Sequence, residues 1–147
     1  MFRGNSFHSL DPKGRLVIPS RFRDVINAAG GGVMMTVLGQ GLYAYTFDEW
    51  NKIEAKVLSM AETSESMRRF RLFFIGGAHR CLCDKQSRIL IPPVLREDAG
   101  LDKEVVLSGL LNHFEIWSRE NWEAEKLRMR EDMQNGTVSA EIAKLGL

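Results

Sequence analysis

A nine-residue segment near the start of the chain, residues 11–19 (DPKGRLVIP), has a counterpart in residues 84–92 (DKQSRILIP). In both segments an Asp precedes an Arg by four positions, three aliphatic residues follow the Arg, and a Pro ends the run. The second segment begins about half a chain length after the first, in a chain of 147 residues. An internal repeat of this kind indicates a duplicated unit, and it constrains the fold more than the composition does.

The segments around the repeated turn follow the same order in both halves. Each copy is expected to contain a strand, the turn, a second strand, a short helix, a β-hairpin and a longer helix. Trp50 and Trp122 also correspond, but they lie one position closer together than Asp11 and Asp84 do, so an insertion or deletion separates the copies, and we place it in the hairpin. A copy of about 45 residues is too small to bury a sufficient core alone. The two copies are therefore expected to form one pseudo-twofold α+β unit, in a closed or nearly closed barrel that leaves few free strand edges.

Hydrophobic periodicity predicts the individual elements. Strands are expected at residues 7–10, 16–18, 33–38, 42–46, 79–83, 88–91, 104–107 and 114–117. Helices are expected at residues 20–29, 48–60, 65–74, 94–99, 120–134 and 139–145. We expect Asp48 to cap the second helix, Thr63 and Ser64 to separate it from the third, and residues 108–112 to form a turn.

Basic residues gather around the two repeated turns, although the net charge of the chain is only +1. Residues 1–24 contain five Lys or Arg against two Asp, and residues 67–88 contain six against one Asp. Residues 48–65 have the opposite balance, with five acids against two Lys. Such clustering is compatible both with chance on a solvated surface and with an anionic partner.

The repeated turn has a structural and a functional interpretation. In the structural one, the Asp opens a turn by accepting backbone N–H groups, and the Arg pairs with it across the turn. In the functional one, Lys13 with Arg15, and Lys85 with Arg88, are exposed for nucleic acid. Lys and Arg neutralise phosphates, and Arg can bind a guanine edge through two hydrogen bonds. An Asp beside each Arg would hold its guanidinium in one orientation.

An enzymatic or metal-binding function has weaker support. The three histidines lie in no recognisable nucleophile or metalloprotease motif. His79, Cys81 and Cys83 alternate in a predicted strand, where they could face one side and hold zinc with a fourth ligand. Their spacing is unusual for structural zinc, and half-buried strand residues explain them as well. We therefore expect no catalytic residues, no metal and no cofactor.

The composition indicates a soluble protein of the cytoplasm. The N-terminal residues lack the apolar core of a signal peptide, and the apolar runs are too short to cross a bilayer. Hydrophobic residues make up 44% of the chain and charged residues 27%, which is typical of a globular domain. Two cysteines, close together, do not make a disulfide framework.

Several segments together resemble the MraZ family of bacterial transcriptional regulators. The resemblance extends from Phe2 to about Glu123, and two Asp-x-x-x-Arg turns at this spacing are specific to it. It is carried by residues 4–23 (GNSFHSLDPKGRLVIPSRFR), 42–50 (LYAYTFDEW), 71–78 (RLFFIGGA), 84–92 and 114–117 (FEIW).

The resemblance implies a fold in more detail. Each half is expected to be an AbrB-type swapped-hairpin unit of the double-ψ kind, and the two halves interleave into one pseudo-twofold β-barrel with flanking helices. The expected boundaries are residues 4–50 for the first repeat, 51–76 for a helical connector, 77–122 for the second repeat and 123–147 for a C-terminal helical tail.

The resemblance also implies a function. The protein is expected to bind short direct repeats in promoter DNA upstream of the cell-division and cell-wall operon that contains its own gene. It would act as a repressor, associated with the nucleoid, and form a ring-shaped homo-oligomer, an octamer or a dodecamer. The alternatives are a ring that binds other proteins without DNA specificity, and a zinc-binding protein.

The expected DNA-binding residues follow from the matching positions. The main ones are Lys13, Gly14, Arg15, Lys85 and Arg88, with Arg3, Arg21, Arg23 and Ser87 as further candidates, and Asp11 and Asp84 organise the turns without contacting DNA.

The second turn departs from the family pattern, which often reads Asp-Lys-x-Gly-Arg. Here Gln86 and Ser87 precede Arg88, and the glycine is missing. Residues other than glycine rarely adopt positive φ. We therefore expect a second turn of different shape, and a smaller loss of DNA binding when Arg88 is removed than when Arg15 is removed. Gln86 and Ser87 could still bond phosphate oxygens.

Overall fold

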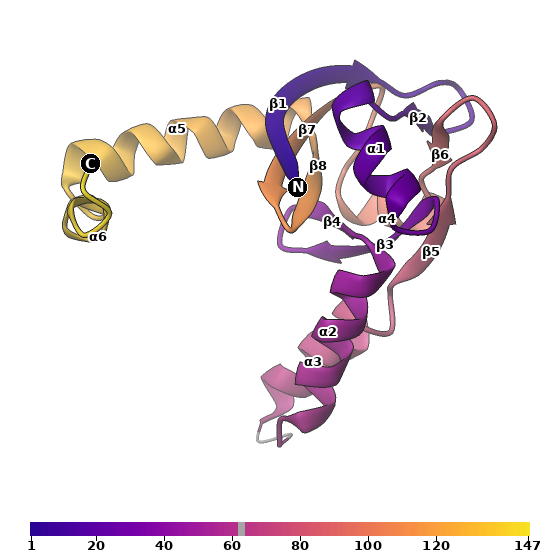
Figure 1. Ribbon diagram of the computed structural model, residues 1–147. Helices are drawn as coiled ribbons and strands as arrows, with labels where there is room; N and C mark the ends of the chain where they lie inside the picture. The colour runs from indigo at the N-terminus through magenta and orange to yellow at the C-terminus, as the bar shows by residue number, and fades with distance from the viewer. Residues whose placement is uncertain (62–63) are drawn as a thin grey trace.

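The computed structural model describes residues 1–61 and 64–147, and it has the mixed α+β composition that the sequence predicts (Figure 1). The predicted break at Thr63 lies outside the described residues, and Ser64 caps the helix that follows. The strands are β1 (Phe2–Ser9), β2 (Arg15–Val17), β3 (Gly32–Leu38), β4 (Gly41–Tyr45), β5 (His79–Leu82), β6 (Arg88–Leu90), β7 (Glu104–Leu111) and β8 (His113–Ser118). The helices are α1 (Ser20–Ala28), α2 (Phe47–Ser59), α3 (Glu65–Phe74), α4 (Pro93–Asp98), α5 (Arg119–Asn135) and α6 (Ser139–Ala143).

The two halves of the chain exchange their first strands. The main sheet is antiparallel, in the order β1-β7-β8-β4-β3-β5, and β2 pairs with β6 in a separate two-stranded ribbon. Thus β1 of the first half lies beside β7 of the second, and β5 of the second half lies beside β3 of the first. Among the described residues, β1 and β5 are the two ends of this sheet. Neither half completes its own sheet, so the halves form one unit.

The strand register has a pseudo-twofold axis. Leu16 lies opposite its own counterpart, Ile89, at the centre of the ribbon. Ser9 pairs with Glu104, and the counterpart of Ser9 in the second half, Leu82, pairs with Gly32. Gly32 and Glu104 are therefore counterparts. They are as far apart in the sequence as Trp50 and Trp122, which is one position less than the separation of the two aspartates. The second copy therefore lacks a residue in the segment between β6 and β7, which contains the six-residue helix α4, compared with the segment between β2 and β3, which contains the nine-residue helix α1. Our placement of this difference in the hairpin was wrong.

The main core lies between the two-stranded ribbon and the inner face of the six-stranded sheet. Leu16, Ile18, Ile89 and Ile91 are completely buried in it, so the aliphatic run after each turn anchors that turn to the core. The rings of Phe2, Phe22 and Phe114 pack with centroids 5.0–5.1 Å apart. Burying such side chains stabilises the fold by about 1.5–3 kcal/mol each.

Helices α2 and α3 pack together and contact β3 and β4, whereas α5 contacts β7 and β8 at its start and then extends away from the sheet (Figure 1). A second apolar cluster forms there around Tyr45, Trp50 and Phe74. The Thr36 hydroxyl donates a 2.6 Å hydrogen bond to the Phe74 carbonyl at the end of α3. No residue of α5 is buried. The two repeats therefore differ mainly in what their last helices contact.

Two local predictions were wrong. Thr46, not Asp48, caps α2, and its hydroxyl accepts the Glu49 N–H. Asp48 lies in the first turn, where its carboxylate complements the helix dipole. Residues 108–111 belong to β7 rather than to a turn, because β1 supplies a partner for Ser108 and Gly109 that the local sequence does not reveal.

Candidate nucleic-acid interface

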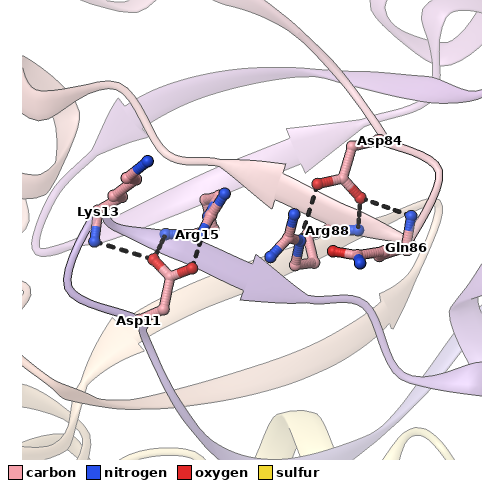
Figure 2. A network of polar contacts seen from close by, with 6 residues as sticks. All are labelled: Asp11, Lys13, Arg15, Asp84, Gln86 and Arg88. Carbon is pink, nitrogen blue, oxygen red and sulfur yellow. Dashed lines mark hydrogen bonds and ion pairs between the residues drawn. The ribbon is translucent and has the colours of Figure 1, made fainter.

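In the two Asp–Arg turns, the aspartate carboxylates accept equivalent hydrogen bonds (Figure 2). In the first, Asp11 Oδ1 accepts from the N–H of Lys13 at 3.0 Å and of Arg15 at 2.8 Å. In the second, Asp84 Oδ1 accepts from the N–H groups of Gln86 and Arg88, both at 2.9 Å. Each Asp carboxylate therefore closes its own turn, as expected for an Asp at the first turn position.

Each Asp also fixes the arginine of its turn. Arg15 Nε donates to Asp11 Oδ2 at 2.5 Å, and Arg88 Nε donates to Asp84 Oδ2 at 2.8 Å. The hydrogen bond from the arginine backbone N–H is the main cause that lowers the pKa of each Asp carboxyl. The arginine side chains stay 29% and 26% exposed. A guanidinium held on one edge by a carboxylate is oriented before any ligand arrives.

Our expectation that the second turn has a different shape was wrong. Ser87 occupies the position of Gly14 and adopts the same left-handed conformation, with φ of 59° against 84° for the glycine. The closing hydrogen bonds to the Asp carbonyl are also equal, at 2.9 Å from Gly14 N and 3.0 Å from Ser87 N. Arg88 is therefore held in the same geometry as Arg15, and the turn shape gives no reason to expect a smaller role for Arg88.

The ribbon β2–β6 joins the two turns and places them at its opposite ends (Figure 2). Each turn also accepts a backbone hydrogen bond from the segment that follows the other turn. Ile18 N donates to Ser87 O at 2.9 Å, and Ile91 N donates to Gly14 O at 3.0 Å. The distance between the two arginines is thus fixed by backbone hydrogen bonds rather than by flexible loops.

The lysines of the two turns are exposed, but they do not occupy equivalent positions. When the two aspartates are aligned, Lys85 corresponds to Pro12, and Gln86 corresponds to Lys13. The second turn therefore carries its lysine one position earlier. The surface formed by Lys13, Arg15, Lys85 and Arg88, which we call the basic ribbon face, is symmetric in its arginines and asymmetric in its lysines.

Two of the further candidates already support the fold. Arg21 donates to the carbonyls of Arg3 and Gly4, at 2.8 and 3.2 Å, and to the Ser6 hydroxyl at 2.8 Å. Arg23 donates to the Ile18 carbonyl at 2.8 Å. Arg21 thus holds β1, and Arg23 holds the end of β2. The remaining candidates differ in exposure, since Arg3 is exposed on β1 and Ser87 is half-buried in its turn.

One residue of the site, Arg96, was missed in the sequence. It donates to the Ile91 carbonyl at 3.1 Å, as its counterpart Arg23 does to Ile18. A Cβ at Gly14 would collide with the guanidinium group of Arg96. Glycine at position 14 therefore suits both the positive φ and the close approach of Arg96, whose guanidinium would have to move to admit a side chain. The signal was available, since Arg23 and Arg96 follow the aspartates of their own turns at the same distance in the sequence.

The cysteines and histidines do not form a site in the part of the chain that is described. Within residues 1–61 and 64–147, no three His, Cys, Asp or Glu side chains are grouped so that they could hold a metal ion. Cys81 is packed in the core, where burial raises its pKa to about 11, whereas His79 is exposed. Among the same residues, no helix is both long and apolar enough to span a membrane.

Comparison with known proteins agrees with the duplicated architecture. A family model described as "MraZ protein, putative antitoxin-like" matches the chain twice, over residues 1–73 and 74–138. The chain belongs to the MraZ family. Each match contains one Asp–Arg turn and one β-hairpin, so the two MraZ units correspond to the two halves that exchange strands.

Curated members of the MraZ family match the whole chain. A protein of Desulforapulum autotrophicum is 58% identical, and one of Desulfosudis oleivorans is 57% identical, each over 100% of both chains. A protein of Acetivibrio thermocellus is 39% identical over the same extent. All three are named transcriptional regulator MraZ, so the names of these relatives describe regulators of transcription.

Proposed function

We propose that this protein is a sequence-specific DNA-binding regulator of transcription that contacts DNA through its basic ribbon face. The observation that carries the proposal is the pair of equivalent turns, each with an arginine oriented by its own aspartate, at the two ends of one rigid ribbon. Oriented guanidinium groups suit bidentate contacts to guanine, and the lysines beside them suit phosphates. Gly14 and the two aspartates shape the turns.

The regulated target is a separate part of the proposal, which the family resemblance implies. We propose that the protein represses the cell-division and cell-wall operon that includes its own gene, by binding short direct repeats in the promoter. This function places it in the cytoplasm, at the nucleoid. The relatives, named as transcriptional regulators, support the class of function.

We further propose that the chain assembles into a ring, an octamer or a dodecamer. One ribbon presents four Lys and Arg side chains, so one subunit can neutralise only a few phosphates. A ring that engages several spaced repeats gains avidity of roughly 10²–10⁴ through effective concentration. The spacing of the repeats then contributes to specificity together with base contacts.

We also propose the AbrB-type swapped-hairpin barrel for the fold of the two repeats. The exchange of first strands, β1 to β7 and β5 to β3, supports this topology. We retain residues 4–50 and 77–122 as the two repeats, residues 51–76 as the connector, and residues 123–147 as the tail.

The proposal is tested by measuring the affinity for duplex DNA from upstream of the protein's own gene. Arg15→Ala and Arg88→Ala are each expected to lose about 1–3 kcal/mol per base contact, roughly 5- to 150-fold in affinity. Because the turns are equivalent, the two losses should be similar. A gel-shift titration measures them, and affinity should fall steeply with added salt.

Arg130→Ala is the matched control, because it removes an exposed arginine from α5, remote from the turns. Its affinity should equal that of the unchanged protein. Binding that is equally tight to scrambled DNA, or unaffected by both turn substitutions, contradicts the proposal. The result would then favour a ring protein without DNA specificity.

A further inference from the structure

The basic ribbon face also carries two exposed aliphatic side chains. Val17 on β2 is 49% exposed, and Leu90 on β6 is 52% exposed. Their neighbours along the strands, Leu16 and Ile89, are completely buried. Because side chains alternate across a strand, Val17 and Leu90 point to the side opposite to the core.

The strand register places these aliphatic residues beside the arginines. Arg15 lies directly opposite Leu90, and Val17 lies directly opposite Arg88. Directly paired residues project from the same face of an antiparallel ribbon, with Cβ atoms about 4.5–5.5 Å apart. The outward face thus alternates Arg and aliphatic residues, and the pseudo-twofold axis relates one pair to the other.

This alternation matches what the major groove of DNA presents. A guanine offers two acceptors to an arginine, and a thymine offers its C5-methyl group to an apolar side chain. The groove is wide enough to admit a two-stranded ribbon. We propose that Val17 and Leu90 contact thymine methyl groups in the major groove, and that they set part of the sequence preference beside Arg15 and Arg88.

The charges around the two aliphatic residues favour DNA over a second copy of the chain as the occupant of this face. Lys13, Arg15, Lys85 and Arg88 lie on the same ribbon and its turns. Two such faces brought together would oppose like charges, which disfavours association. A nucleic acid supplies phosphates for the lysines and an apolar methyl for the aliphatic residues.

The inference rests on the proposed DNA-binding function, and deoxyuridine separates the two. Replacing one thymine of the bound duplex by deoxyuridine removes only the C5-methyl group and keeps the base pair. The unchanged protein is expected to lose about three- to fivefold in affinity at each contacted position, the value of one buried methyl group. Positions outside the contact should show no change.

The variants Val17→Ala and Leu90→Ala complete a double-mutant cycle. Each is expected to bind the thymine duplex more weakly, and to lose its sensitivity to deoxyuridine at the position it contacted. Leu127→Ala, which truncates an exposed aliphatic residue of α5 outside the ribbon, is the matched control and should keep full sensitivity.

The outcomes separate the two proposals. Specific binding with no deoxyuridine effect at any position overturns this inference and leaves the proposed function intact. Absence of binding to the unmodified duplex overturns both. A reduced oligomer mass of Leu90→Ala, with the deoxyuridine effect unchanged, assigns the face to a second copy and also overturns the inference.

Discussion

At the scale of single residues, Ser87 shows that the second turn keeps the geometry of the first at an energetic cost. A left-handed backbone costs a residue other than glycine about 1–2 kcal/mol. Ser87 nevertheless adopts φ of 59° and keeps the hydrogen bonds that orient Arg88. The fold therefore imposes the turn geometry against the local preference of the sequence.

Ser87→Gly is expected to stabilise the protein by about 0.5–1 kcal/mol. Glycine relieves the left-handed strain, and its greater freedom in the unfolded chain offsets part of the gain. Chemical denaturation measures the free energy of unfolding. Gln86→Gly is the control, because the backbone of Gln86 is not left-handed and only the entropic cost remains. If the two substitutions have equal effects, the strain at Ser87 is not what limits stability.

Two Arg–Phe contacts lie at equivalent places in the two repeats, but the Arg and the Phe have exchanged positions between them. The guanidinium of Arg80 lies 4.1 Å from the ring centre of Phe47, and that of Arg119 lies 4.3 Å from that of Phe7. In the first pair the strand carries the Arg, and in the second the helix does. A cation–π contact of this kind contributes about 0.5–1 kcal/mol. Aligning the copies by residue type does not reveal this pair.

At the scale of elements, the two long helices have different surroundings. In α2, Trp50 is 3% exposed between the sheet and α3. Its counterpart in α5, Trp122, is only half-buried, and α5 has no buried residue. The repeat thus duplicated the helix and its contact with the sheet, but α2 is followed by α3, which also packs against β3, and α5 projects away from the sheet.

Trp50→Ala is therefore expected to cost about 3–5 kcal/mol of folding free energy, as large-to-small changes in a core do. Trp122→Ala should cost less than half as much, because its side chain has fewer neighbours to lose. Thermal or chemical unfolding of both variants measures the difference. An equal loss at Trp122 would mean that α5 is packed in the assembled protein.

The sequence predicted most elements and the chemistry of the turns, and the family resemblance implied interleaved halves, but the pairing of individual strands was not predicted. Turn residues and periodicity are local signals, and they located the Asp–Arg turns and the helices within a few residues. The pairing of β1 with β7 is set by tertiary packing, so neither the full length of β1 nor the continuation of β7 through Ser108 and Gly109 was predicted. Arg96 follows Asp84 at the distance at which Arg23 follows Asp11, so the sequence marked its position, but its contact with the first turn depends on how closely that turn approaches α4.

At the scale of the whole molecule, affinity depends on the number of ribbons that reach DNA together. Light scattering is expected to give a mass of about eight or twelve times the 16.7 kDa chain, corresponding to the octamer or the dodecamer. DNA containing a single repeat should bind much more weakly than DNA with several, because avidity multiplies the contacts. A monomeric mass at the concentration that binds DNA would contradict the ring.

The exchange of strands also determines when the protein can finish folding on the ribosome. Phe2 leaves the ribosome early, but its partner in the sheet is Leu111. At a synthesis rate of about 5–20 residues per second, the first strand waits roughly 5–20 s for the strand that covers it. The hairpin β3–β4, whose strands are adjacent in the chain, can form during that time. The segment made first is thus among the last to be protected, and the nascent chain carries an open strand edge for most of its synthesis.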